Sequence, residues 1–372
     1  DTFVSENSGG LLKPRNLIFG PDGNLYVGSV DSSEILRYDG QTGAFLDTFV
    51  ASGGALQEPG GLQFSPLDND LYVADVATNQ IHRFDGQTGA HVDSPVNGLA
   101  RPLGVTFNSD GGLLIANGDT DEVLLYDGSS LSSFVTSGSG GLDEPRNAVF
   151  GPDGSLYVSS EHTQEILRYD GTTGAFLDVF ATTNLGNSGP NWIEFGNDDI
   201  LYASSRTTDA CCERSIIRFD AASGDLIDTF DKGVDGWSFV IGPDNLIYNA
   251  GNSFGNVVTR IGPESTAALT VSLSTTSATT VTVDYTTSDG SATVGSDYEQ
   301  STGTLVFEPG ATSRTIIVPT LDDTIPEPDE TFSVTLSNAV GTTMLDSQGT
   351  GTIADNDAGT TISYPDFSDT SN

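Results

Sequence analysis

Short apolar runs separated by turn residues recur along the first two thirds of the chain. In the first copy they are Asn16–Phe19, Leu25–Val27, Glu34–Tyr38 and Ala44–Val50. Gly-Pro-Asp-Gly and Asp-Gly sequences lie between them, and Pro and Gly preset the backbone angles of tight turns. The runs are too short for helices and rich in β-forming residues, so they predict four short strands.

This four-run unit repeats with a period of 43 to 46 residues. The sequence of Pro14–Val27 returns almost unchanged at Pro145–Val158. The positions that open the successive units are Pro14, Pro59, Pro102, Pro145, Pro190 and Gly236. Such a period is typical of a four-stranded propeller blade, and a single blade must stack on its neighbours to bury its faces. The pattern predicts an all-β, six-bladed propeller.

The sixth unit ends before its fourth strand. The first residues, Asp1–Val4, read Asp-Thr-Phe-Val, as do residues 47–50 in the fourth run of the first unit. We therefore expect Asp1–Val4 to complete the sixth blade, which removes an exposed sheet edge and closes the ring. The repeat resembles the NHL family and related six-bladed propellers, including the gluconolactonase and streptogramin-lyase-like groups. This resemblance covers about residues 1–262. It implies the fold strongly and the chemistry only weakly, because propellers host unrelated functions.

After residue 262 the pattern changes to alternating Thr, Ser and Val residues, as in Thr280–Tyr285 and Thr315–Val318. A period of two predicts an antiparallel β-sandwich. Four sequence segments, at 287–298, 303–310, 321–332 and 351–357, together closely resemble a Calx-β domain, which implies an immunoglobulin-like sandwich. We expect three regions: a propeller at 1–262, a Calx-β sandwich at 263–358, and residues 359–372 as an extended tail or the start of a following domain.

Acidic residues fall in loops that should gather at one end of this sandwich. Ca²⁺ prefers six to eight oxygen ligands, and neighbouring carboxylates repel each other without a cation. The family resemblance implies calcium ligands at Glu264, Asp297, Asp323, Glu327, Glu330, Asp355 and Asp357, and at the Ile325 carbonyl. Thr324 and Asn356 stand where the family often carries Asp, which lowers the charge of the site. Alternatively, the carboxylates only solvate the loops.

The formal net charge of −39 comes from 52 acidic and 13 basic residues. Such a surface repels nucleic acid and anionic membranes and favours cations. No apolar run approaches the ~20 residues of a membrane span. We expect a secreted or cell-surface protein, with a saline extracellular habitat as the simplest reason for the charge.

The two cysteines, Cys211 and Cys212, are adjacent in a long insertion at 204–215. They are candidates for a strained vicinal disulfide, for free thiols or for a bond to another chain. A metal site needs more ligands than these two offer.

One face of the propeller, around the central channel, is a candidate binding site. It should gather the polar and aromatic residues Arg15, Asn16, Arg146, Asn147, Asn191, Trp192 and Trp237. Paired arginines in a chain with few basic residues favour a carboxylate or sulfate ligand, and the tryptophans are suited to stacking a sugar ring. Alternatively, these side chains satisfy backbone groups and plug the channel.

Catalytic constellations are weak in this sequence. Of the three histidines only His162 should reach the candidate face, and we find no nucleophile–base pair and no His-rich metal set. Asp75 and Asn117 leave open a lactonase-like metal site in the channel. We expect no enzyme, and the alternative is a propeller hydrolase or lyase with a metal in the channel.

The segment after the sandwich alternates like a strand that lacks a partner, at Thr360, Thr361, Ile362, Ser363 and Tyr364. The strand that should open the sandwich falls on Asn256–Ile261, which the propeller repeat also claims. The sandwich therefore lacks its first strand or shares one with the propeller. Docking of the tail into that position in a neighbouring copy would build head-to-tail filaments. Otherwise the tail is disordered or begins another domain.

Together these patterns predict a calcium-binding structural or adhesive protein. The propeller is the binding platform and the Calx-β sandwich is a joint that Ca²⁺ stiffens. The expected partners are a surface protein, a carbohydrate or copies of the chain itself.

Overall fold

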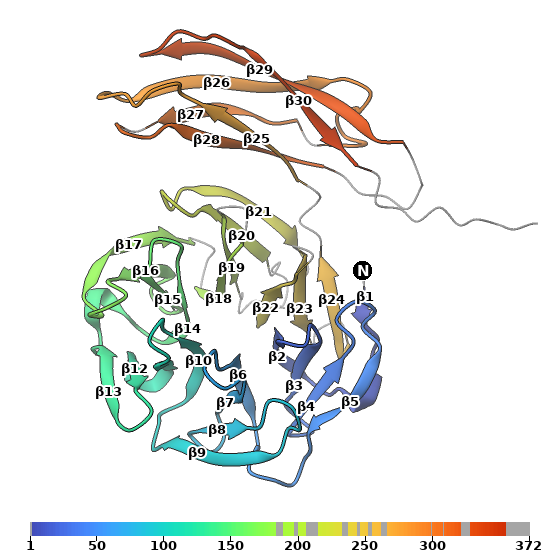
Figure 1. The fold of residues 1–372 in the computed structure, drawn as a ribbon, viewed down its shortest axis with the longest axis vertical. Coiled ribbons are helices and arrows are strands. Elements are labelled where there is room, and N and C mark those ends of the chain that lie inside the picture. The colour runs from blue at the N-terminus through green and yellow to red at the C-terminus, as the bar shows by residue number, and fades with distance from the viewer. Residues whose placement is uncertain are drawn as a thin grey trace, which may run out of the picture. The chain divides into compact units, whose positions relative to one another are not determined.

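The computed structural model describes residues 2–183, 189–196, 200–205, 215–232, 237–243, 246–251, 255–261, 266–298, 300–307, 309–320 and 328–354. The chain divides into two compact units, residues 1–261 and residues 262–372. Each unit consists of β-strands, as Figure 1 shows.

Within the described residues, unit 1 contains six four-stranded antiparallel sheets. The first is β2 (Pro14–Phe19), β3 (Leu25–Ser29), β4 (Glu34–Tyr38) and β5 (Phe45–Val50). The second is β6 (Pro59–Phe64), β7 (Leu71–Asp75), β8 (Gln80–Phe84) and β9 (His91–Asn97). The third is β10 (Pro102–Phe107), β11 (Leu113–Asn117), β12 (Glu122–Tyr126) and β13 (Leu131–Val135). These are the strands that the repeat predicts.

The fourth sheet is β14 (Pro145–Phe150), β15 (Leu156–Ser160), β16 (Glu165–Tyr169) and β17 (Phe176–Thr182). The fifth is β18 (Pro190–Phe195), β19 (Ile200–Ser205), β20 (Ser215–Asp220) and β21 (Leu226–Lys232). The sixth is β22 (Ser238–Ile241), β23 (Ile247–Gly251), β24 (Val257–Ile261) and β1 (Thr2–Val4). Three short 3₁₀ turns are η1 (Ser8–Gly10), η2 (Gly118–Thr120) and η3 (Ser139–Gly141).

The first strands of the six sheets form a closed cycle. Strand β2 contacts β6, and contacts continue through β10, β14, β18 and β22 back to β2. Figure 1 shows the sheets arranged as blades around a common centre. Strand β1 pairs with β24, with Thr2 opposite Thr259 and Val4 opposite Val258. The N-terminal strand therefore completes the sheet that the last repeat leaves unfinished, as predicted.

Hydrophobic clusters fill the spaces between neighbouring blades. One cluster joins Val4 and Tyr248 of the sixth sheet to Val27 of the first. The next joins Phe49 of the first sheet to Leu71 of the second. Each blade thus buries its apolar residues against the following blade, which is why a single unit could not fold alone.

The turn between the third and fourth strands follows from its Asp-Gly-Gln-Thr-Gly sequence. Asp39 Oδ1 accepts the backbone N–H groups of Gln41 and Thr42 at 3.1 and 2.8 Å. Gly43 has φ of 68° and lies against the Phe3 carbonyl, where a Cβ atom would collide with that oxygen. Glycine is required here for both its dihedral angles and its size.

Unit 2 is a two-sheet β-sandwich in the described residues. One sheet pairs β25 (Thr266–Ser272) with β28 (Ser313–Pro319). The other has the order β27 (Thr302–Phe307), β26 (Val281–Asp289), β29 (Glu330–Val340) and β30 (Gln348–Ile353). Val283, Phe307, Val318 and Phe332 are buried between the sheets, and the Tyr298 ring stacks on Phe332 with centroids 4.9 Å apart.

Residues 257–261, which both domains could claim from sequence, form β24. They pair with β23 and β1 in the sixth sheet of the propeller. The first described strand of the sandwich is β25, and its sheet has two strands against four in the other.

Candidate functional site

Six of the seven residues predicted for the propeller face line one small pocket. The pocket has a volume of about 30 Å³ and is formed by Arg15, Asn16, Gly60, Gly61, Leu103, Arg146, Asn191, Trp192 and Trp237. These residues come from the inner strands of several blades, so the ring itself brings them together. The volume suits a water molecule or a small ion and is too small for a sugar ring.

Arg15 contacts a carboxylate and an aromatic ring. Its Nη1 lies 2.5 Å from Glu58 Oε1, and its guanidinium lies over the Trp237 ring, 5.0 Å from the centroid. Burial lowers the pKa of Arg15, Glu58 opposes this shift, and Arg146 adds to it. Arg15 and Arg146 line the same pocket, and the charge of Arg146 acts on Arg15.

Arg146 is held between two buried carboxylates. Its Nη2 lies 2.7 Å from Glu144 Oε1 and also contacts Glu161. Burial opposes ionisation of Glu144, but Arg146 and Arg101 outweigh this effect and lower its pKa. Burial raises the pKa of Glu161, and the nearby Glu144 adds to the shift.

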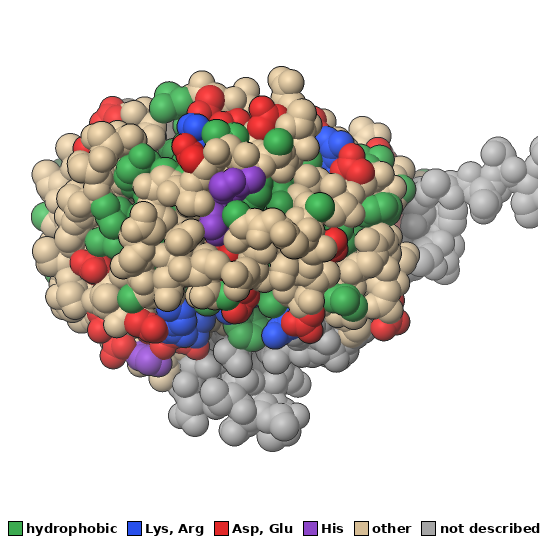
Figure 2. Space-filling view, turned by 90° about the horizontal axis from the view of Figure 1, so that it is seen from below, with side chains coloured by type: hydrophobic (Ala, Val, Ile, Leu, Met, Phe, Trp, Pro, Cys, Tyr) green, Lys and Arg blue, Asp and Glu red, His purple; other side chains and the backbone are tan. Residues whose placement is uncertain are grey.

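Further ion pairs extend this network. Glu144 also contacts Arg101, and its Oε2 lies 2.7 Å from His162 Nε2. His162 Nδ1 lies 2.8 Å from Asp143 Oδ1, and this hydrogen bond raises the pKa of His162. In Figure 2 the basic side chains on the visible face lie beside acidic ones rather than in a patch of their own. The internal pairing weakens the electrostatic argument for a bound anion.

The two Asn residues of the repeated Pro-Arg-Asn sequence behave differently. Asn147 is buried and does not line the pocket, because its Nδ2 donates to the Ile193 carbonyl at 2.9 Å and its Oδ1 accepts the Ala148 N–H at 2.9 Å. Asn16 lines the pocket, and its buried Oδ1 has no hydrogen-bond partner among the described residues. A bound water or small cation would satisfy this oxygen.

Asp75 and Asn117 do not present their oxygens to the channel. Asp75 is fully buried, and its carboxylate accepts backbone N–H groups from Gln57 at 2.7 Å and from Glu58 at 3.1 Å. Asn117 Oδ1 accepts the Ala100 N–H at 2.8 Å. Each side chain holds the loop that enters its own blade, so the lactonase-like metal site considered from sequence finds no support in their contacts.

Three strand pairings gather, at one end of the sandwich, the described residues next to its acidic segments. Tyr298, which follows Asp297, forms an isolated bridge with Thr320, the last described residue before 321–327. Glu330 lies opposite Ile353, two residues before Asp355. Thr266, two residues after Glu264, lies opposite Pro319. The described residues that border the predicted calcium segments therefore lie at the same end of the sandwich.

Hydrogen bonds fix the Asp297 loop beside Glu330. The Ala292 N–H donates to the Thr331 carbonyl at 2.9 Å, and the Thr331 N–H donates to Ser291 Oγ at 2.8 Å. Asp297 Oδ2 accepts the backbone N–H of Thr293 at 2.7 Å and its hydroxyl at 2.9 Å. The carboxylate is thereby oriented within its loop.

Asp297 and Glu330 are the two predicted calcium ligands among the described residues. The others, Glu264, Asp323, Ile325, Glu327, Asp355 and Asp357, lie outside them, as do Cys211, Cys212 and the tail residues 360–364. In the described part of the chain no group of three or more His, Cys, Asp or Glu side chains is placed to hold a metal ion. The donor chemistry nevertheless fits Ca²⁺, which takes carboxylate and carbonyl oxygens.

Comparison with known proteins agrees with this organisation. Residues 257–357 match the Calx-beta domain. Sodium/calcium exchanger 2 of Rattus norvegicus is 57% identical over 56 residues, which are 15% of this chain and 6% of the exchanger. Sodium/calcium exchanger 1 of Canis lupus familiaris is 56% identical over 59 residues, which are 16% of this chain and 6% of the exchanger. The chain therefore matches only about 6% of the length of these exchangers.

Two solved structures resemble the propeller. A gluconolactonase from Xanthomonas campestris superposes with a TM-score of 0.53 and 18% identity, covering 68% of this chain and 86% of that one. A streptogramin B lyase gives a TM-score of 0.50 and 17% identity, covering 70% and 86%. At these identities the likeness shows the fold alone. Among the described residues no helix has the length and apolarity of a membrane span.

Sequence reasoning missed the carboxylates that neutralise the propeller arginines. Glu58 and Glu144 each precede the proline that opens a blade, so a repeated Glu-Pro at 58–59 and 144–145 was the available signal. Glu58 pairs with Arg15 of the preceding blade, whereas Glu144 pairs with Arg146 of its own blade.

Proposed function

We propose that this is a calcium-binding structural or adhesive protein of the cell surface or extracellular space. A six-bladed propeller serves as its rigid binding platform, and the Calx-β domain serves as a joint that Ca²⁺ stiffens. The observation that carries the proposal is that the described residues bordering the acidic segments meet at one end of the Calx-β domain.

The charge balance of unit 2 supports a bound cation. Arg314 is its single basic residue, against acidic residues at every predicted ligand position except Ile325. Arg314 Nε donates to the Val306 carbonyl at 2.8 Å, on strands β28 and β27 of the sandwich body. Unit 2 therefore has no other basic side chain that could neutralise its acidic loops. Ca²⁺ would supply that charge and cross-link the loops.

Calcium binding is tested directly by isothermal titration calorimetry of the full chain after removal of divalent ions with a chelator. The proposal predicts saturable Ca²⁺ binding with at least one site per chain. Mg²⁺ should bind more weakly, because it demands a tighter octahedral geometry and gives up its water reluctantly. No heat of Ca²⁺ binding at millimolar concentration would refute the proposal.

The propeller face is better suited to a macromolecular partner than to a small substrate. Its pocket is small, Arg15 and Arg146 are already paired with carboxylates, and Arg15 covers one face of Trp237. Trp192 remains half-buried at the pocket and is available for contact. We propose a surface protein or carbohydrate chain as partner and no enzymatic role, since the contacts of Asp75 and Asn117 do not favour a hydrolase or lyase centre.

A further inference from the structure

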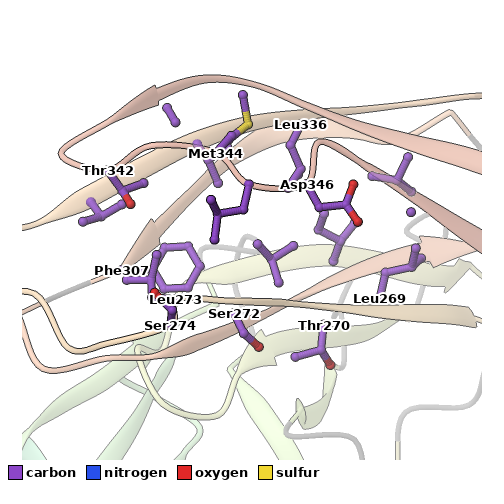
Figure 3. A pocket seen from close by; sticks show the side chains of 18 of the residues that line it. Leu269, Thr270, Ser272, Leu273, Ser274, Phe307, Leu336, Thr342, Met344 and Asp346 are labelled. Atoms are coloured by element: carbon purple, nitrogen blue, oxygen red, sulfur yellow. The ribbon is translucent and has the colours of Figure 1, made fainter.

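The Calx-β domain has an open apolar groove beside β25. The groove has a volume of about 390 Å³, and Leu269, Leu273, Phe307, Leu336 and Met344 are among the residues that line it. Figure 3 shows Leu269 directed into the groove, while Thr270 and Ser272 point to the other side of the strand. Leu345 at the rim is 92% exposed. So much accessible apolar surface in an acidic domain indicates a surface that something covers.

Strand β25 borders the groove, and in the described part of unit 2 it is paired on one side. All seven residues of β25 pair with β28, from Thr266 opposite Pro319 to Ser272 opposite Ser313. In the described part of unit 2 no strand pairs with the other edge of β25. Such an edge offers backbone N–H and C=O groups to an added strand.

The family match explains why this position is open. The Calx-β match begins at residue 257, but residues 257–261 form β24 and pair with β23 and β1 in the propeller. The residues that open the matched sequence are therefore not part of the described sandwich, whose first strand is β25.

We infer that residues 360–364 of a second copy of this chain add as a strand to the free edge of β25. The segment reads Thr-Thr-Ile-Ser-Tyr. Side chains alternate along a strand, so Ile362 and Tyr364 would share one face and enter the groove, while Thr361 and Ser363 would face solvent. Main-chain hydrogen bonds supply affinity in this mode of recognition, and pockets for alternate side chains supply specificity.

The segment of the same chain would have to approach the groove from its far end. Strand β30 ends at Ile353, whereas the groove is lined by Gln348 and Gly349 at the other end of that strand. Six residues, 354–359, connect the end of β30 to Thr360. Such a connection spans at most about 20 Å, and within that length it must cross to the opposite sheet, about 10 Å away, and reach the groove. Hydrogen exchange of the β25 amides in the monomer distinguishes this arrangement from insertion by a second copy.

Repetition of this contact builds a head-to-tail assembly, because each copy offers one segment and one groove. Two chains with a net charge of −39 repel each other, so the contact should strengthen when salt screens that charge. The inference deepens the proposed function, since it specifies how copies of the protein would join.

Sedimentation velocity of the full chain over a range of concentrations tests the inference, with saturating Ca²⁺ and moderate salt. We compare wild type with Ile362→Asp and with the matched control Ser363→Asp, which adds the same charge on the opposite face. Wild type and Ser363→Asp should associate, and Ile362→Asp should weaken association at least about tenfold, which is 1.4 kcal/mol. Circular dichroism checks that the variants keep the β content of wild type.

Three results would overturn it: monomers at every concentration, equal association of the two variants, or a monomer whose β25 amides are protected from hydrogen exchange. The last result would place the segment of the same chain in the groove. Calcium calorimetry of Ile362→Asp separates this inference from the proposed function. If Ile362→Asp is monomeric and still binds Ca²⁺, the substitution has affected assembly alone. If wild type does not bind Ca²⁺, the proposed function is refuted.

Discussion

The propeller face and the Calx-β domain differ in the basic side chains that they offer to their carboxylates. Both belong to a chain with four times as many acidic as basic residues. On the propeller face, Arg15 pairs with Glu58, and Arg146 pairs with Glu144 and Glu161. The Calx-β domain has Arg314 as its single basic residue, and that side chain binds a backbone carbonyl.

The difference separates two sources of stability. A unit that neutralises its carboxylates with its own arginines keeps its stability whatever ions are present. A unit that leaves them to a metal ion gains stability in proportion to the logarithm of the free ion concentration. The propeller should therefore be constitutively rigid, and the Calx-β domain should respond to calcium.

The largest effect is expected from breaking the propeller network. Arg146 and both of its carboxylate partners are nearly buried, with side chains 10 or 11% exposed. Arg146→Met should lower the free energy of unfolding of the propeller by about 3–5 kcal/mol, because it leaves the buried Glu161 carboxylate without its basic partner and removes one of the partners of Glu144. Chemical denaturation with excess chelator measures this loss.

Arg37→Met is the matched control for that experiment. It breaks the Arg37–Asp47 pair, whose Asp47 side chain is 46% exposed, and should cost about 1 kcal/mol or less. Equal losses in the two variants would contradict the idea that burial makes the Arg146 network important.

Glu194 in β18 is expected to avoid a buried charge in another way, by keeping its proton. Burial raises the pKa of Glu194 to about 8, and a hydrogen bond from the backbone of Ile241 opposes the shift. An unfolded Glu has a pKa of about 4.3, so the folded state holds an extra proton between about pH 4.3 and 8. The stability that this proton provides is present below about pH 4.3 and is lost as pH rises to 8.

Glu194→Gln should therefore make the propeller more stable than wild type above pH 8, by about 1–3 kcal/mol, and leave it nearly unchanged at pH 4. Denaturation of both proteins across this pH range measures the difference. Parallel curves for wild type and variant would show that Glu194 titrates normally.

A smaller effect is expected at the calcium end. Asp297→Asn removes one charged ligand and should weaken Ca²⁺ binding about tenfold, or 1.4 kcal/mol. Asp284→Asn makes the same change in β26, where the carboxylate accepts hydrogen bonds from Thr304 at 2.6 Å and Asn338 at 2.9 Å. Calorimetric titration should show wild-type affinity for Asp284→Asn. If both variants lose affinity equally, general charge rather than ligation is responsible.

The propeller was predictable because its signals are local and repeated. Turn residues mark every blade, and the Asp-Thr-Phe-Val sequence at the N-terminus predicts the pairing of β1 with β24, which the register of Thr2 and Thr259 confirms. The Calx-β domain was recognisable for a similar reason, since its acidic sequence segments are distinctive, and the family match confirms it.

The chemistry of the propeller face was less predictable because it depends on contacts between sequence-distant residues. Asn16 and Asn147 occupy identical Pro-Arg-Asn sequences, yet Asn147 is satisfied by the Ile193 carbonyl while Asn16 Oδ1 is buried without a described partner. Gly28 stands at the repeat position of Ser159, whose hydroxyl accepts the backbone N–H of Asn147. The pairing of Arg15 with Glu58 likewise joins neighbouring blades.

Differential scanning calorimetry of the full chain, with millimolar Ca²⁺ and again with excess chelator, tests the central contrast most directly. Two transitions are expected, one for each compact unit. Chelation should lower the Calx-β transition, by an amount equivalent to about 2.7 kcal/mol if the free ion exceeds its Kd a hundredfold, and should leave the propeller transition in place. Unchanged transitions, or an equal shift of both, would contradict the account.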